Sequence, residues 1–341
     1  MEMTGIRGSR LRGARTTTDS LVRTAELDER GLPPYVIEPS MPGVDLRAWA
    51  EQSLSTVEEL LHRHGALLFR GFGIPDVPAF EAAAAALVGG ELYGDYGDLP
   101  RESAGEKIFG STPYPADEMI CMHNESSHMS QWPMRIFFYC AIAAETGGAT
   151  PIVDCRKAYA ALPPDLRDRF EERGLRYVRN FVPGVDVSWQ HFFGTDDRQV
   201  VEAKCAETAT EVTWIDGGEQ LRIAQRADAV KVHPVTGEKV FFNQVLLHHP
   251  AALPAATRSA LLGLLPVDGL PRNVTFGDGS PIPDEDIAAV AATHDSLMTA
   301  ERWSRGDILM VDNMLCCHGR MPFTGSRKIL VGMARIVDSA G

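Results

Sequence analysis

The sequence lacks several features that would assign a protein to an easily recognised class. Its six cysteines contain no C-x-x-C pair and none of the spacings of a structural zinc site. No apolar run approaches the length of a membrane-spanning helix, and no apolar signal segment stands at the N-terminus. Basic residues are in the minority, 33 against 46 acidic residues, which gives a formal net charge of −13. These features predict a cytoplasmic protein that binds neither nucleic acid nor membrane.

The chain also lacks internal repeats and any low-complexity linker that would divide it into halves. Residues 1–32 are polar and predict a flexible N-terminal tail. The remaining residues, 33–341, predict a single domain, since single β domains often reach this length. The composition, 44% hydrophobic and 23% charged, is that of an ordinary globular protein.

Hydrophobic periodicity predicts a mixture of strands and helices. Helical spacing covers 45–64, 80–88, 158–174 (interrupted at Pro163 and Pro164), 255–265 and 285–293. Strand patterns cover 65–71, 135–143, 150–153, 176–182, 231–233, 239–242, 307–311 and 328–336. The stretch 89–115 is rich in Gly, Pro and Ser and predicts a long loop. We expect 89–122 and 180–210 to act as lids.

Two distant segments carry the strongest chemical signal. His123 and Glu125 form a His-x-Glu pair, and alternation along an extended chain projects both side chains the same way. His318 is predicted to end an apolar strand that begins near Asp307, and it offers a third ligand. Two histidines and one carboxylate are the ligand set that holds non-heme Fe(II) and leaves positions open for cosubstrate and oxygen.

An arginine follows the last histidine at short spacing. Arg327 stands in the sequence Thr-Gly-Ser-Arg-Lys, and its permanent charge suits the remote carboxylate of 2-oxoglutarate. Thr150, just after Gly147 and Gly148, offers a hydroxyl to the same carboxylate. The spacing therefore predicts an oxygenase that uses iron and 2-oxoglutarate.

Other residues have simpler explanations. Cys316 and Cys317 are expected to pack in the core without reacting. His248 and His249 are expected at the surface or as caps rather than as ligands. His128, close after the His-x-Glu pair, leaves open a substrate contact or an ordinary polar surface position.

Several motifs together resemble the taurine/2,4-dichlorophenoxyacetate dioxygenase superfamily, in its clavaminate-synthase-like group. The chain is most similar to the branch that includes the syringomycin-pathway aspartyl hydroxylase. The likeness runs from about residue 34 to the C-terminus, and its motifs are 109–115 (FGSTPYP), 123–128 (HNESSH), 147–154 (GGATPIVD), 242–244 (FNQ), 276–279 (FGDG) and 312–323 (DNMLCCHGRMPF).

The resemblance implies a mainly β fold with α decoration, a double-stranded β-helix or jelly roll. It implies Fe(II), 2-oxoglutarate and O2, with His123, Glu125 and His318 as metal ligands and Thr150 and Arg327 as cosubstrate contacts. An intact Glu125 favours hydroxylation, because related halogenases replace this carboxylate to make room for chloride.

Two positions depart from the family pattern. His128 stands where this branch often has an aromatic residue, and Val331 stands where clavaminate-type enzymes place an arginine for the substrate carboxylate. The nearest downstream arginine is Arg335. His128, Asn243 and Arg335 are the candidate substrate contacts, and a substrate presented by a carrier protein becomes easier to accommodate.

The sequence thus predicts hydroxylation of a small amino-acid-derived substrate, free or carrier-tethered, in specialised metabolism such as antibiotic biosynthesis. Desaturation, cyclisation or oxidative decarboxylation would use the same cofactors. A non-catalytic metal-binding jelly roll and a zinc hydrolase are the rivals of a different class.

Overall fold

The computed structural model describes residues 21–94, 105, 107–110, 114–182 and 184–338. The predicted tail at 1–20 and parts of the first predicted lid lie outside these residues. No helix of the described part is long and apolar enough to cross a membrane.

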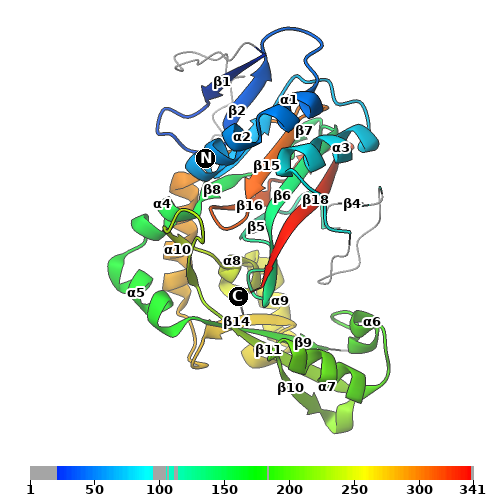
Figure 1. The fold of residues 1–341 in the computed structure, drawn as a ribbon. Helices are drawn as coiled ribbons and strands as arrows, with labels where there is room; N and C mark the ends of the chain where they lie inside the picture. Colours follow the sequence, from blue (N-terminus) through cyan, green and yellow to red (C-terminus); the bar gives the residue numbers. More distant parts are fainter. Residues whose placement is uncertain (1–20, 95–104, 106, 111–113, 183, 339–341) are drawn as a thin grey trace.

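A seven-stranded sheet forms one wall of the molecule, in the order β1-β2-β3-β15-β6-β18-β4. Its neighbouring strands are antiparallel except for the parallel pair β2–β3. Three helices cover its outer face (Figure 1), where Phe80 of α3 stacks on Tyr139 of β6. The elements are β1 Val22–Glu26, β2 Tyr35–Pro39, α1 Leu46–Gln52, α2 Leu54–His64, β3 Ala66–Phe69, α3 Val77–Val88, β4 Ile108–Gly110, β6 Gln131–Ile142, β15 Ile308–Asp312 and β18 Lys328–Asp338.

The inner face of this sheet packs on smaller sheets. They are the three-stranded β5-β16-β8 and the two-stranded β17-β7. Side chains along β6 point alternately to the two faces of the sheet. Phe137 and Tyr139 pack under the helices, whereas Phe138 and Cys140 pack with Cys316 in the core between the sheets. The two packed β layers give the jelly roll that the resemblance implies. The strands are β5 Ile120–His123, β7 Thr146–Gly147, β8 Ile152–Asp154, β16 Cys316–Arg320 and β17 Phe323–Thr324.

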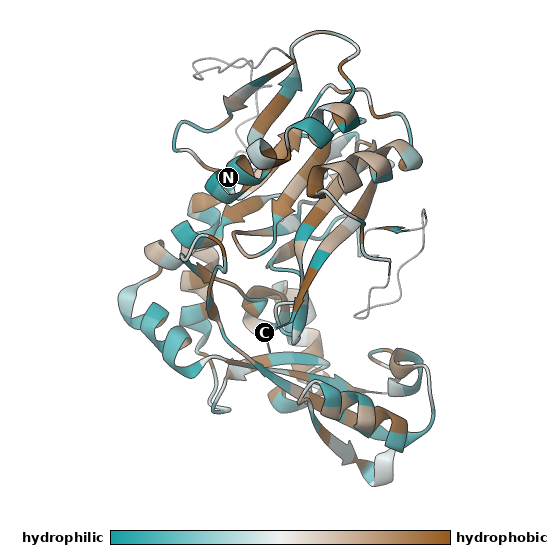
Figure 2. Cartoon of the chain, in the orientation of Figure 1, coloured by the Kyte–Doolittle hydropathy of each residue, from teal (hydrophilic) through white to brown (hydrophobic). Residues whose placement is uncertain are grey.

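A second sheet, β10-β11-β9-β14, extends from the jelly roll and carries its own aromatic cluster. Figure 2 shows the contrast in hydropathy between the apolar strands under α1–α3 and the largely hydrophilic helix α5. These remaining elements are α4 Cys155–Ala161, α5 Pro164–Arg173, β9 Leu175–Phe181, α6 Trp189–Phe193, α7 Arg198–Glu207, β10 Glu211–Ile215, η1 Asp216–Gly218, β11 Gln220–Ala227, β12 Val230–Val232, β13 Lys239–Phe241, α8 Val245–His248, η2 Pro250–Ala252, α9 Ala255–Leu264, η3 Val267–Gly269, β14 Arg272–Phe276 and α10 Asp284–Leu297.

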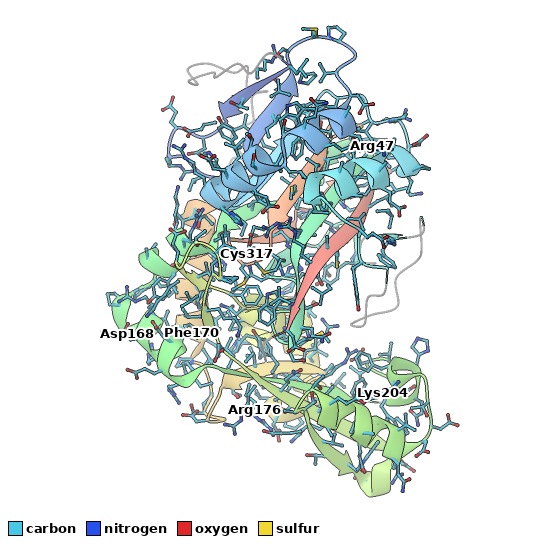
Figure 3. The ribbon with its side chains drawn as sticks, viewed as in Figure 1. Arg47, Asp168, Phe170, Arg176, Lys204 and Cys317 are labelled. Atoms are coloured by element: carbon cyan, nitrogen blue, oxygen red, sulfur yellow. The ribbon has the colours of Figure 1, made fainter. Side chains whose placement is uncertain are left out.

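The cysteines next to the candidate ligand His318 are buried. Cys316 and Cys317 are 0% and 2% exposed, and burial raises the pKa of the Cys316 thiol well above its ordinary value. Figure 3 places Cys317 in the interior, between Arg47 on α1 and Arg176 on β9. Their predicted packing role is confirmed, since a buried neutral thiol is inert.

Several boundaries differ from the prediction. The segment predicted as one helix over 45–64 is two, because Ser53 ends α1 and starts α2. The predicted tail is too long, because Val22–Glu26 pairs with β2. Ile108–Gly110 lies in the predicted loop but pairs with β18, and His318 lies within the separate strand β16 rather than at the end of the strand from Asp307. The helix break at Ser53 is local, whereas the strand differences depend on pairing with other segments of the chain.

Candidate active site

Strand pairing brings the two candidate histidine ligands together. His123 at the end of β5 is the direct partner of His318 on β16, and their ring centroids lie 4.4 Å apart. Nδ1 of His123 lies 2.8 Å from the carbonyl oxygen of Cys121, so Nδ1 carries the proton and donates it. This bond leaves the lone pair on Nε2 and fixes the tautomer that a metal ligand requires.

Glu125 lies just beyond β5, in a tight turn. Ser126, the next residue, has a φ of 56°, an uncommon conformation for a residue other than glycine. The Asn313 side chain holds the turn: its Oδ1 accepts from the Glu125 amide at 2.8 Å, and its Nδ2 donates to the Glu125 carbonyl at 2.9 Å. Asn313 is fully buried, so its side-chain amide fixes the backbone position from which the Glu125 side chain extends.

The three candidate ligands converge. Oε2 of Glu125 lies 3.8 Å from Nε2 of His318, and one ligand atom from each of His123, Glu125 and His318 lies within 4.8 Å of the others. Ligand bonds of about 2 Å at right angles place donor atoms roughly 3 Å apart, so small side-chain rotations would close the set around one ion. Two neutral imidazoles and a carboxylate fit Fe(II).

Arg327 lies beside the strand pair β17–β7. Its Nε donates to the Gly148 carbonyl at 2.9 Å, and a Cβ added at Gly148 would lie 3.0 Å from its Cδ. Burial and the nearby Arg320 guanidinium lower the pKa of Arg327 to about 10. Among the described residues no carboxylate pairs with Arg327. A half-buried cation without a counter-ion is a fitting partner for an anionic cosubstrate.

Thr150 lies two positions beyond Gly148. Its Oγ1 accepts a hydrogen bond from the indole nitrogen of Trp303 at 3.3 Å. Because the indole N–H is a donor only, this bond leaves the Thr150 hydroxyl proton available to a carboxylate.

His128 lies in an aromatic group beside the ligand turn. Its ring is 5.7 Å from that of Tyr177 on β9 and 5.5 Å from that of His248 on α8. His248 was not predicted near the site, and the adjacent His249 caps η2 as expected. Burial first, and then the charge of His128 and of Arg272, lower the pKa of His248 well below its ordinary value. Nothing in the local sequence indicates this contact, which depends on the packing of α8 against β5.

The other two candidate substrate contacts are engaged elsewhere. The Asn243 side chain donates to Ala229 and accepts from the Val245 amide, at the start of α8. Arg335 pairs with Glu58 at 3.0 Å and donates to the Val88 carbonyl. The structure therefore does not bring Arg335 to the ligand cluster, because its strand position faces the outer helices.

A second group of metal-type side chains lies behind the first. His62, His233 and Asp312 also place ligand atoms within 4.8 Å of one another. Here, however, Arg135 fills the centre: it lies 2.6 Å from Asp312, 3.1 Å from His62 Nε2 and 2.9 Å from Glu58. A guanidinium already occupies the place of a cation. Although burial opposes ionisation, the His233 hydrogen bond and the Arg135 charge lower the pKa of Asp312.

The comparisons with known proteins show the family of the chain. A family model described as taurine catabolism dioxygenase TauD, TfdA family, matches residues 28–334. The chain is 36% identical over 280 residues to the dapdiamide synthesis protein DdaC of Enterobacter agglomerans, covering 81% of this chain and 84% of that one. It is 29% identical over 320 residues to a clavaminate synthase-like protein of Arabidopsis thaliana, covering 89% and 93%.

Solved structures show the same fold. PvcB of Pseudomonas aeruginosa, described as an Fe, alpha-ketoglutarate dependent oxygenase from an isonitrile synthetic pathway, matches with a TM-score of 0.55 at 16% identity and 98% coverage of both chains. A structure from Burkholderia xenovorans described as a 2,4-D dioxygenase matches with a TM-score of 0.53 at 17% identity, over 94% and 99% of the chains.

Proposed function

Because the chain belongs to the taurine catabolism dioxygenase TauD, TfdA family and is an Fe(II)- and 2-oxoglutarate-dependent oxygenase, we propose that it hydroxylates an amino-acid-derived small molecule in specialised metabolism. The observation that carries the proposal is the convergence of His123, Glu125 and His318. With iron bound, the carboxylate of Glu125 would take the ligand position that halogen transfer would need open. The likeness to a dapdiamide synthesis protein supports the biosynthetic context.

We assign the iron to His123, Glu125 and His318. The Cys121 carbonyl holds His123 in the tautomer that presents Nε2, and the Asn313 amide holds the Glu125 backbone on both sides. When bound, Fe(II) with 2-oxoglutarate and O2 supplies a two-electron oxidation of a C–H bond, with succinate and carbon dioxide as coproducts.

The cosubstrate contacts follow from charge and hydrogen bonding. Arg327 binds the remote carboxylate of 2-oxoglutarate through its two terminal nitrogens, while its Nε stays on the Gly148 carbonyl. The Thr150 hydroxyl donates to the same carboxylate, because Trp303 uses only its acceptor capacity. Phe138, whose ring lies 4.9 Å from that of His318, limits water beside the ligand.

The decisive experiment is anaerobic addition of Fe(II) and then 2-oxoglutarate to the apoprotein. The expected result is a weak visible charge-transfer band that is lost in Glu125→Ala. In Arg327→Gln the band should require roughly 30-fold more 2-oxoglutarate, since losing one partner of a buried charge pair costs about 2–5 kcal/mol. Lys328→Gln, exposed and adjacent, is the matched control and should leave the requirement unchanged.

Substrate screening then follows succinate release, and product mass identifies the outcome. Gain of one oxygen supports hydroxylation, whereas loss of two hydrogens indicates desaturation or cyclisation and loss of carbon dioxide from the substrate indicates decarboxylation. Absence of the charge-transfer band from the folded wild-type protein would contradict the cofactor assignment itself.

A further inference from the structure

In the C-terminal strand β18, neither Val331 nor Arg335 is placed to hold a charged group of the substrate, and Lys328 is exposed. Val331 is 3% exposed and packs in the core between the sheets. Arg335 is engaged by Glu58 and by the Val88 carbonyl. A substrate with a negative charge would therefore need a cation from another element.

The opposite side of the site contains such an element, the sheet formed by β9 and β14. Tyr177 of β9 contacts the rings of His128 and His248, at 5.7 Å and 5.0 Å between centroids. His128 follows Glu125 in the ligand turn, and Gln244 of the α8 cap donates to the Asn124 carbonyl in that turn. This face of β9 is thus joined to the turn that carries Glu125 through His128 and Gln244.

Arg272 lies on the same face. It is the direct strand partner of Arg179, and Val274 is the partner of Tyr177, so Arg272 is a diagonal neighbour of Tyr177. Diagonal neighbours on one face lie about 7–8 Å apart, within reach of a long side chain. The charge of Arg272 also reaches His248 and contributes to lowering its pKa.

Two guanidinium groups on adjacent strand partners leave this face short of negative charge. Arg179 pairs with Asp186 at 3.2 Å. Arg272 is half-buried, and within the described part of the chain it forms no ion pair and no side-chain hydrogen bond. Like charges directly opposite one another destabilise a sheet, so an anion at this place would relieve the repulsion.

We propose that Arg272 binds an anionic oxygen group of the substrate, beside His128, Tyr177 and His248. The inference rests on the proposed function and adds the charge of the substrate class to it. His248 supports the subsite as a neutral group, because its Nδ1 proton is donated to the Gln244 carbonyl and burial keeps the ring uncharged. The guanidinium of Arg272 is therefore the group that would distinguish a negatively charged substrate from a neutral one.

An anionic oxygen group has two chemical sources here. One is the free carboxylate of an N-acylated amino acid, and the other is the phosphate of a pantetheine arm on a carrier protein. Both would form charge-assisted hydrogen bonds with Arg272. The proximity of Arg272 to the ligand turn favours the carboxylate, because a pantetheine arm separates its phosphate from the reacting carbon by many bonds.

The test measures binding to the anaerobic Fe(II)–2-oxoglutarate complex by calorimetry and by perturbation of the charge-transfer band. The probes are a panel of N-acetyl amino acids with their primary amides, and 4′-phosphopantetheine with pantetheine. The expected result is at least about 10-fold tighter binding of the acids than of the amides. Arg272→Gln should abolish this difference, and Arg272→Lys should restore part of it.

Arg305→Gln is the control, since Arg305 is an exposed arginine without an ion pair in the described chain. It should bind every probe as the wild type does. Preference for 4′-phosphopantetheine over pantetheine, lost in Arg272→Gln, would assign the subsite to a carrier arm. Equal binding within both probe pairs (acid and amide, 4′-phosphopantetheine and pantetheine), no binding of any probe, or wild-type discrimination in Arg272→Gln would each overturn the proposal. A wild-type protein that forms no charge-transfer band would instead contradict the proposed function.

Discussion

Two clusters in this molecule contain the same classes of side chain and differ in what lies between them. His123, Glu125 and His318 each place one ligand atom within 4.8 Å of the others, and we assign iron to the space between them. In the other cluster, Arg135 donates to Asp312 at 2.6 Å and reaches His62. Both clusters would satisfy a search for two histidines and a carboxylate, yet in the second a guanidinium already holds the central place.

The difference lies in where the balancing charge comes from. In the second cluster the balancing charge is the guanidinium of Arg135, which belongs to the chain itself. His233 adds a hydrogen bond to the same carboxylate: its Nδ1 accepts from two backbone amides, so its Nε2 donates to Asp312. In the first cluster Oε2 of Glu125 lies 3.8 Å from Nε2 of His318, and we propose that bound iron supplies the balancing charge. The guanidinium at its centre therefore distinguishes the second cluster from a metal site with the same types of ligand.

The largest expected effect would separate the two clusters directly. His318→Ala should reduce Fe(II) affinity by more than about 100-fold, because even groups that only orient ligands contribute about 10–100-fold. His62→Ala should leave iron binding unchanged. Bound iron measured after desalting is the readout. Equal losses in both variants, or a second equivalent of iron that disappears in His62→Ala, would break the comparison.

The second cluster should respond in stability instead. Asp312→Asn should lower the free energy of unfolding by about 3–5 kcal/mol, because it leaves the fully buried Arg135 without its closest carboxylate. Urea unfolding of the apoprotein measures this change. Asp168→Asn, in an exposed pair with Arg167, is the control and should have little effect. Similar losses in the two variants would show that the buried Arg135–Asp312 pair contributes no more to stability than an exposed ion pair.

A smaller effect would sharpen the connection between the clusters, since Asn313 adjoins Asp312. Asn313→Ala should lower Fe(II) affinity by about 10–100-fold, because it releases the Glu125 turn. Asn180→Ala removes an amide that is equally engaged, to the Asp268 and Leu270 carbonyls, and should lower stability alone. Unchanged iron affinity in Asn313→Ala would contradict the role of Asn313 in holding the Glu125 turn.

The smallest effect concerns a buried histidine that belongs to neither cluster. Both ring nitrogens of His294 lack a hydrogen-bond partner among the described residues, and burial lowers its pKa to about 4. Because the unfolded pKa is higher, the unfolded state binds the proton first and stability falls as pH drops from about 6.5 to 4. At pH 5 this histidine should lower the free energy of unfolding by about 2 kcal/mol relative to neutral pH, and His294→Leu should remove that contribution. An identical pH profile of urea unfolding in both proteins would contradict this.

The sequence predicted the parts of the fold and site that depend on local pattern. The apolar runs at 135–143 and 328–336 became β6 and β18, and the prolines at 163 and 164 separate α4 from α5. His123, Glu125 and His318 could be proposed together because the first two are close in sequence and the third follows an apolar strand. The structure brings these three side chains together.

What could not be predicted depends on distant packing. Arg335 was a reasonable candidate by spacing, but its position on β18 places it beside the outer helices, where it forms an ion pair with Glu58. Tyr177, His248 and Arg272 come from three elements. The docking of β9 and α8 brings Tyr177 and His248 beside His128, and the pairing of β14 with β9 makes Arg272 a diagonal neighbour of Tyr177. The β10–β11 hairpin was missed although Val212 and Trp214, and Leu221 and Ile223, alternate with polar residues.

The arginine at the centre of the second cluster has a consequence for how the protein acquires its metal. Asp312 ends β15, accepts from the Met314 and Leu315 amides, and so sets the turn that delivers His318. Because Arg135 supplies that turn with its counter-charge, the backbone that positions His318 does not depend on a bound metal for charge balance, unlike a zinc finger. We therefore expect iron to bind to a chain that is already folded.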